Sequence, residues 1–205
     1  YYFENSIYMC FSFEVSITTF LVSWGISIYL LQQDLTNEQY RNVIFLMIFS
    51  SMQLVDAILW ATDMKKDWIN YFVTSFLIPF ILSLQIIYNI FFINQINNIG
   101  DYIFIFFICL FLFYIFHGYS KKSCNSLGSP QWASINLSHI LMLCFAFLVT
   151  YGRIGFNGEK LAFLIIIFLS LFSSWFFSSG IGSLWCAFAN ILSFYYLIKY
   201  NDSTK

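Results

Sequence analysis

The sequence predicts an all-α protein, a polytopic bundle of about seven transmembrane helices joined by short loops. Of the 205 residues, 60% are apolar and only 9% are charged, whereas a soluble domain is about one-quarter charged. The apolar residues form runs long enough to cross about 30 Å of hydrocarbon as helices, which takes roughly 20 residues each. These runs do not alternate between apolar and polar residues as the strands of a membrane barrel do. We therefore expect a single transmembrane helical domain over residues 1–205, in an integral, multi-pass membrane protein.

Seven runs are apolar enough to be spans, and the stretches between them carry the Gly, Asn, Asp, Lys and Ser that end helices. In chain order, the expected spans are Tyr8–Leu31, Val43–Trp60, Trp68–Ile93, Tyr102–His117, Gln131–Tyr151, Leu161–Phe177 and Ile181–Lys199. Pro79 is expected to kink the third span, because proline removes one backbone hydrogen bond. The fourth and sixth spans contain almost nothing polar and are expected to face lipid. Lys and Arg are split four against five between the two sides, so the positive-inside rule leaves the orientation open.

Two acidic residues lie well inside predicted spans, Glu14 in the first and Asp56 in the second. A charged side chain in hydrocarbon costs several kcal/mol, so it is expected to face the bundle interior and to mark a functional site. Glu14 is about 9 Å in from Tyr8, and Asp56 is about 6 Å before Trp60, at 1.5 Å per residue. Because the two spans are antiparallel, both depths are measured from one membrane face. The two carboxylates are therefore expected at one level, in a polar half-cavity open to that face.

Other polar side chains are expected to converge at that level from the second, fifth and seventh spans. The candidate site residues are Glu14, Gln53, Asp56, Asn136, His139, Cys186 and Asn190. The far half of the bundle is poorer in polar residues and offers Ser23, Gln85 and Asn89. Ser, Thr and Asn in spans often only join neighbouring helices by hydrogen bonds. The alternative for the two acids is a shallow position from which they reach interfacial water.

Several kinds of chemistry lack support in the sequence. A covalent retinal protein needs a lysine midway along its last helix, whereas here Lys199 lies at the exit of the seventh span. There is no HExxH motif, Gly-rich phosphate loop or cluster of metal ligands, and the five cysteines form no CxxC pair. Nine basic against ten acidic residues give no excess of positive charge for nucleic acid. We expect no enzyme activity, no cofactor and no metal, with the lipid bilayer as the principal partner.

Three stretches carry a resemblance to a known family. The segment Met9–Ser16, MCFSFEVS, resembles the "MCxS" opening of a multispan membrane protein family of giant viruses and algae. Met52-Gln53 followed by Asp56 is similar to the Met-Gln and acid of that family's second helix, and Gly182–Cys186 is similar to its terminal "SxWCW" signature. The resemblance implies a multispan architecture and a viral or algal source, and it implies no particular activity.

A second resemblance concerns Pro130-Gln131, which opens the fifth span. It is similar to the motif of PQ-loop or SWEET-like carriers, which have three helices, a linker helix and three more. The lipophilic fourth span would then be the linker, and the function implied is that of a carrier.

Three functions are compatible with these features. The first is a channel or transporter for protons, cations or a small solute, in which Glu14 accepts the proton or cation and Asp56 shares or relays the charge. The second is a non-catalytic structural or partner-binding membrane subunit, as a homo-oligomer or within a larger membrane assembly. The third is a receptor-like bundle that binds a ligand or a lipid.

Overall fold

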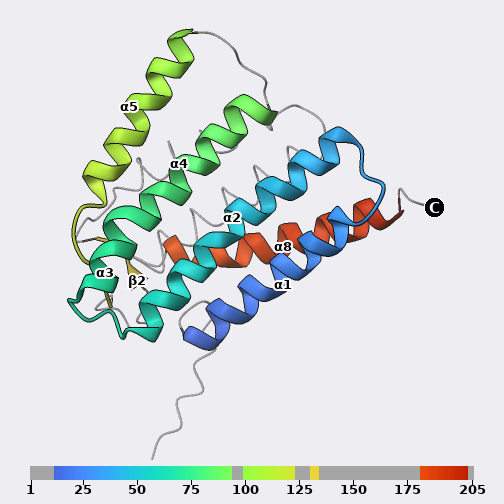
Figure 1. The fold of residues 1–205 in the computed structure, drawn as a ribbon. Helices are drawn as coiled ribbons and strands as arrows, with labels where there is room; N and C mark the ends of the chain where they lie inside the picture. The colour runs from blue at the N-terminus through green and yellow to red at the C-terminus, as the bar shows by residue number, and fades with distance from the viewer. Residues whose placement is uncertain (1–11, 94–98, 123–129, 134–180, 203–205) are drawn as a thin grey trace, which may run out of the picture.

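The computed structural model describes residues 12–93, 99–122, 130–133 and 181–202, and within them it is almost entirely helical (Figure 1). The elements are α1 (Phe13–Leu31), α2 (Asn37–Ala61), α3 (Trp68–Phe72), η1 (Val73–Leu77), α4 (Ile78–Tyr88), η2 (Asn89–Ile93), α5 (Ile99–Ile115), β1 (Lys121–Lys122), β2 (Pro130–Gln131) and α8 (Ile181–Asp202). Here η denotes a π-helical turn. The expected all-α class is confirmed for the described residues.

Three described helices are long and apolar enough to cross a membrane: Phe13–Leu31, Asn37–Ala61 and Trp68–Phe92. They correspond to the first three expected spans. The fourth and seventh are present as α5 and α8, although the apolar stretch of α5, Tyr102–Ile115, is shorter. The expected spans Gln131–Tyr151, beyond Ala133, and Leu161–Phe177 lie outside the described residues. The expected count of seven therefore stays a prediction.

Capping residues set the starts of the first two helices. In α1, the Ser12 hydroxyl accepts a hydrogen bond from the backbone N–H of Val15, so the described helix begins at Phe13. In α2, Thr36 and Gln39 form a reciprocal capping box, which satisfies two backbone N–H groups at once. The helix consequently begins six residues before Val43, the start that apolarity alone predicts. The polar residues that precede Val43 are therefore part of α2, although hydropathy alone does not predict them to be.

The third predicted span is one continuous helical rod built from α3, η1, α4 and η2, and its predicted bounds are correct. A π-helical turn, Val73–Leu77, ends two residues before Pro79, where the kink is expected. Pro79 has no N–H to donate to the carbonyl of Ser75, four residues earlier, so the regular helical hydrogen-bond pattern cannot continue there. The widened turn carries Thr74 and Ser75, which bind a loop described below.

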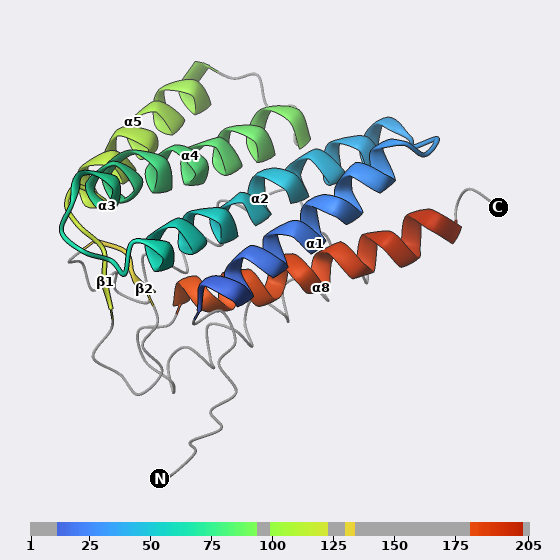
Figure 2. The same cartoon turned by 60° about the horizontal axis from the view of Figure 1, so that its bottom comes forward.

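Helix α2 is the central element of the described structure. It packs against α1 and α8 on one side and against α4 on the other, while α5 lies outside α4 (Figure 1). Figure 2 shows that the β hairpin and the beginnings of α1 and α8 lie at one end of the bundle, where α2 ends. We refer to this end as the hairpin end.

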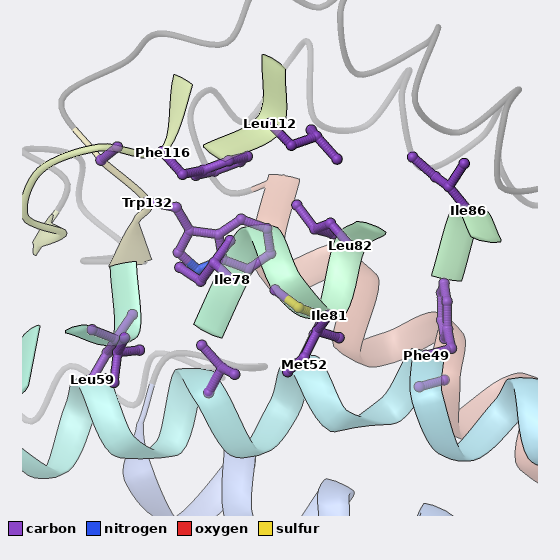
Figure 3. Packing of buried hydrophobic residues seen from close by; sticks show 14 of the residues in the cluster. Phe49, Met52, Leu59, Ile78, Ile81, Leu82, Ile86, Leu112, Phe116 and Trp132 are labelled. Atoms are coloured by element: carbon purple, nitrogen blue, oxygen red, sulfur yellow. The ribbon is translucent and has the colours of Figure 1, made fainter. Parts of the chain in front are cut away.

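The main apolar cluster fills the space between α2, α4 and α5. Figure 3 shows Trp132 and Phe116 at one end of it and Ile86 and Phe49 at the other. The buried side chains between them include Met52, Ile78, Ile81 and Leu82. A second cluster joins α1, α2 and α8 and includes Leu30, Leu46, Tyr196 and Tyr200. The two clusters cover opposite sides of α2.

Helix α5 presents an unusually aromatic exposed surface, which we call the α5 face. Its exposed large side chains are Ile99, Tyr102, Ile103, Phe104, Phe106, Phe107, Leu110, Phe111 and Tyr114. A helix that is apolar on nearly every side is typical of a membrane span. The lipid-facing position expected of the fourth span stays a prediction.

Replacing Leu82 with Ala should lower the free energy of unfolding by about 2–4 kcal/mol, because the change leaves a cavity between α2 and α4. Thermal unfolding in mild detergent measures the effect. The control is Leu110→Ala on α5, since Leu110 is 50% exposed and Leu82 only 4%. Equal destabilisation by both variants would show that the α2–α4 contact is not a packed core.

Candidate functional site

The candidate site is organised around Asp56, which is fully buried on α2. Its Oδ1 accepts a hydrogen bond of 2.8 Å from the indole Nε1 of Trp132. Trp132 follows β2 directly, is itself buried, and has its ring centroid 6.5 Å from that of Phe116. A carboxyl group in the interior of the bundle is thus bonded to a neutral donor that a loop delivers.

A short hairpin places Trp132 over Asp56. Strands β1 and β2 pair antiparallel, with Lys121 opposite Gln131 and Lys122 opposite Pro130, and β2 packs against both α2 and α8. Ala133, the next residue, is fully buried and has a φ of 55°. A non-glycine residue in the left-handed region is strained by roughly 1–2 kcal/mol. The surrounding packing holds that strained turn, which fixes the direction in which Trp132 enters the bundle.

Asn70 anchors the chain that leads into the hairpin. Its Nδ2 donates to the carbonyls of Lys65 and Ser120, at 2.9 Å each. Its Oδ1 accepts from the N–H of Ser120 at 2.8 Å and from the hydroxyl of Thr74 at 3.0 Å. The hydroxyls of Thr74 and Ser120 lie 2.7 Å apart. Four hydrogen bonds fully satisfy the amide, so this network has a structural role.

A second pair of contacts extends this anchor. Ser75 Oγ donates to the carbonyl of Gly118 at 3.1 Å and accepts from its N–H at 2.9 Å. Gly118 has a φ of 142°, a conformation that favours glycine. The hydroxyl of Tyr71 lies 2.9 Å from Nε2 of His117. The loop after α5 is therefore bound along the polar side of α3 and η1.

An ion pair lies outside the spans at the same end. Lys122 bonds to the carboxylate of Asp63, and its ammonium is 5.7 Å from the ring centroid of Trp60. The hydrogen bond and the charge of Lys122 lower the pKa of Asp63 below its usual value. Both partners are substantially exposed, so the pair adds little stability.

The structure gives the two acidic residues different environments. Glu14 lies in the first turn of α1 and is exposed, whereas Asp56 is fully buried. The reason is the start of α1 at Phe13, which puts Glu14 at the beginning of the described helix rather than almost two turns into it. An acid there complements the positive end of the helix dipole. The half-cavity expected between Glu14 and Asp56 stays a prediction.

The remaining predicted site residues are distributed differently. Gln53 is buried on α2, three residues before Asp56. Asn190, on α8, accepts a hydrogen bond of 3.0 Å from Ser23 Oγ and so joins α8 to α1. Cys186 lies on α8, but its side chain is outside the described part. Asn136 and His139 lie outside the described residues altogether.

Sequence reasoning missed the role of Trp132 and the functional interest of Gln85. Gln85 is fully buried on α4, and neither its Oε1 nor its Nε2 has a hydrogen-bond partner among the described residues. Each unsatisfied buried polar atom costs about 1–3 kcal/mol. Ser83 Oγ, on the same helix, is also buried without a partner in this part of the chain. The signal in the sequence was an amide side chain in the apolar stretch Ile78–Tyr88.

Residues 12–93, 99–122, 130–133 and 181–202 contain no group of three or more His, Cys, Asp or Glu side chains placed to hold a metal ion.

Replacing Asn70 with Ala should destabilise the protein by about 3 kcal/mol or more, because the buried N–H and C=O of Ser120 and the Thr74 hydroxyl all lose a partner. Thermal unfolding is the measurement. Asn42→Ala is the control, since Asn42 donates one partly buried hydrogen bond to Tyr200 and should cost about 1 kcal/mol. Similar losses in both variants would argue against the anchoring role of Asn70.

Replacing Lys122 with Met should return the pKa of Asp63 toward its ordinary value, about 3.9, because the ion pair lowers it. A carboxyl group with a lowered pKa stabilises the fold above its ordinary pKa, and this contribution is lost as the pH falls through the lowered value. The ¹³C chemical shift of the Asp63 carboxyl, followed by NMR against pH, gives the pKa. Lys121→Met is the control and should leave it unchanged.

Comparison with protein-family models, with curated proteins and with solved structures finds no match.

Proposed function

We propose that the protein moves protons, or another small cation or polar solute, across a membrane, and that Asp56 is the group that binds the transported species. The observation that carries the proposal is the complete burial of this acid in a helix long and apolar enough to span a membrane. Ionisable side chains in that environment are costly and commonly mark ion or proton pathways. Glu14, which is exposed, has no part in this proposal.

The contact between Asp56 and Trp132 is compatible with binding and release of a proton. Trp132 donates to Oδ1, and a carboxylic acid that carries its proton on Oδ2 still accepts at Oδ1. The donor is a neutral indole, while Lys122 of the same hairpin forms its ion pair with Asp63. The indole therefore orients the carboxyl group in both protonation states.

The position of Asp56 supports a carrier more than an open pore. Asp56 lies about 7.5 Å before the end of α2, from five residues at 1.5 Å each, and the hairpin covers this end (Figure 2). Toward the other end, the interior is filled by the apolar side chains of Met52, Ile81 and Leu82 (Figure 3). Asp56 thus has the hairpin on one side and a packed apolar layer on the other, so transport in this proposal requires the hairpin to move away from Asp56 in part of the cycle, as alternating access does.

Liposomes that contain the purified protein and a pH-sensitive dye test the proposal. Asp56→Asn should reduce proton flux at least tenfold while the protein still folds, because Asn cannot carry the proton. Glu14→Gln is the matched control and should leave the flux unchanged, since Glu14 is exposed at the start of α1. Wild-type flux in the Asp56 variant, at equal reconstitution, would remove Asp56 from the pathway.

A second candidate function is a non-catalytic membrane subunit. The α5 face favours it, because a broad aromatic surface suits association with a second copy or another membrane protein as well as contact with lipid. This candidate predicts an oligomer in mild detergent that Phe106→Ala and Phe107→Ala weaken. A strictly monomeric particle by light scattering would count against it.

A further inference from the structure

Gln85 differs from every other buried polar side chain in the described part of the chain, because both of its hydrogen-bonding atoms lack a partner. Asn70 shows the contrast: it is buried to the same degree and makes four hydrogen bonds. An apolar residue of similar volume at this position of α4 would fill the same space in the bundle and would leave no buried polar atom without a hydrogen bond. Each orphaned group in a folded protein needs an explanation, and a bound molecule is one.

The position of Gln85 separates it from Asp56. It follows Trp68 by 17 residues, about 25 Å along the rod at 1.5 Å per residue. Its neighbour Ile86 lies at the far end of the apolar cluster from Trp132 (Figure 3). Asp56 and Gln85 thus belong to opposite halves of the bundle, with Met52, Ile81 and Leu82 between them.

The chemistry of the amide defines the ligand. A glutamine side chain is neutral and offers an acceptor at Oε1 and donors at Nε2, so its complement is a neutral molecule with both a donor and an acceptor. A bare cation would leave Nε2 unsatisfied, and an anion would leave Oε1 unsatisfied.

We infer that the Gln85 amide binds a small neutral molecule that carries both a hydrogen-bond donor and an acceptor, either water or a urea-like amide. The inference rests on the proposed function, in which this molecule is the transported solute or the water that carries a proton beyond Asp56. Gln85 is then a second binding site on the transport pathway, in the half of the bundle opposite the hairpin end.

The test compares wild type with Gln85→Met in liposomes, using proton flux and, by stopped-flow light scattering, urea permeability. Thermal unfolding in detergent is measured in parallel. Gln85→Met should be at least as heat-stable as wild type, because it removes a buried amide that has no hydrogen-bond partner. The flux that wild type shows, of protons or of urea, should fall at least tenfold in this variant. Ser83→Ala is the matched control, because it removes another orphaned polar atom from α4; it should keep both stability and flux.

The outcomes separate the two sources of the ligand. Loss of proton flux in Gln85→Met, with wild-type urea permeability no higher than in protein-free liposomes, identifies water. Urea permeability that wild type shows and the variant lacks identifies an amide solute. The inference is overturned if Gln85→Met matches Ser83→Ala in both fluxes, if it is less heat-stable than wild type, or if wild type shows neither flux. Proton flux that Asp56→Asn abolishes and Gln85→Met retains overturns this inference alone and leaves the role of Asp56 standing.

Discussion

The hydrogen bond from Trp132 to Asp56 is the contact on which the hairpin end of the bundle depends. A carboxyl group in a membrane span must find its partners within the protein, since hydrocarbon offers none. The indole meets that need and in doing so draws the hairpin against α2 and α8. Asn70, Thr74 and Ser75 hold the approach to the hairpin in turn, through the loop after α5. The hairpin is thus held from two sides, by the contact of Trp132 with Asp56 and by the network around Asn70.

The buried polar residues fall into two groups with different meanings. Those around Asn70 satisfy one another and connect segments far apart in the chain, as polar groups in membrane proteins commonly do. Gln85 satisfies nothing within the described residues and lies where an apolar side chain would be more stable. Polar groups retained at a cost to stability are more informative about function than polar groups that are fully bonded.

The sequence predicts some parts of this structure well, for identifiable reasons. The rod from Trp68 to Ile93 is recognisable because an apolar run of that length has one stable form in a membrane. The start of α1 cannot be recognised in the sequence, because the residues just before Phe13 are as apolar as those after it. The cap at Ser12 is a single side-chain contact. Trp132 is equally hidden, since its partner is 76 residues away and such a pair leaves no local pattern. The start of α1 differs from the predicted one for the first reason, and the role of Trp132 was missed for the second.

Helix α2 belongs to both packed groups, with α1 and α8 on one side and α4 and α5 on the other. A helix shared in this way couples the two packed groups, because neither can shift without disturbing its contacts with α2. Asp56 lies on this shared helix, so a rearrangement of either group would change the packing around a buried carboxyl group.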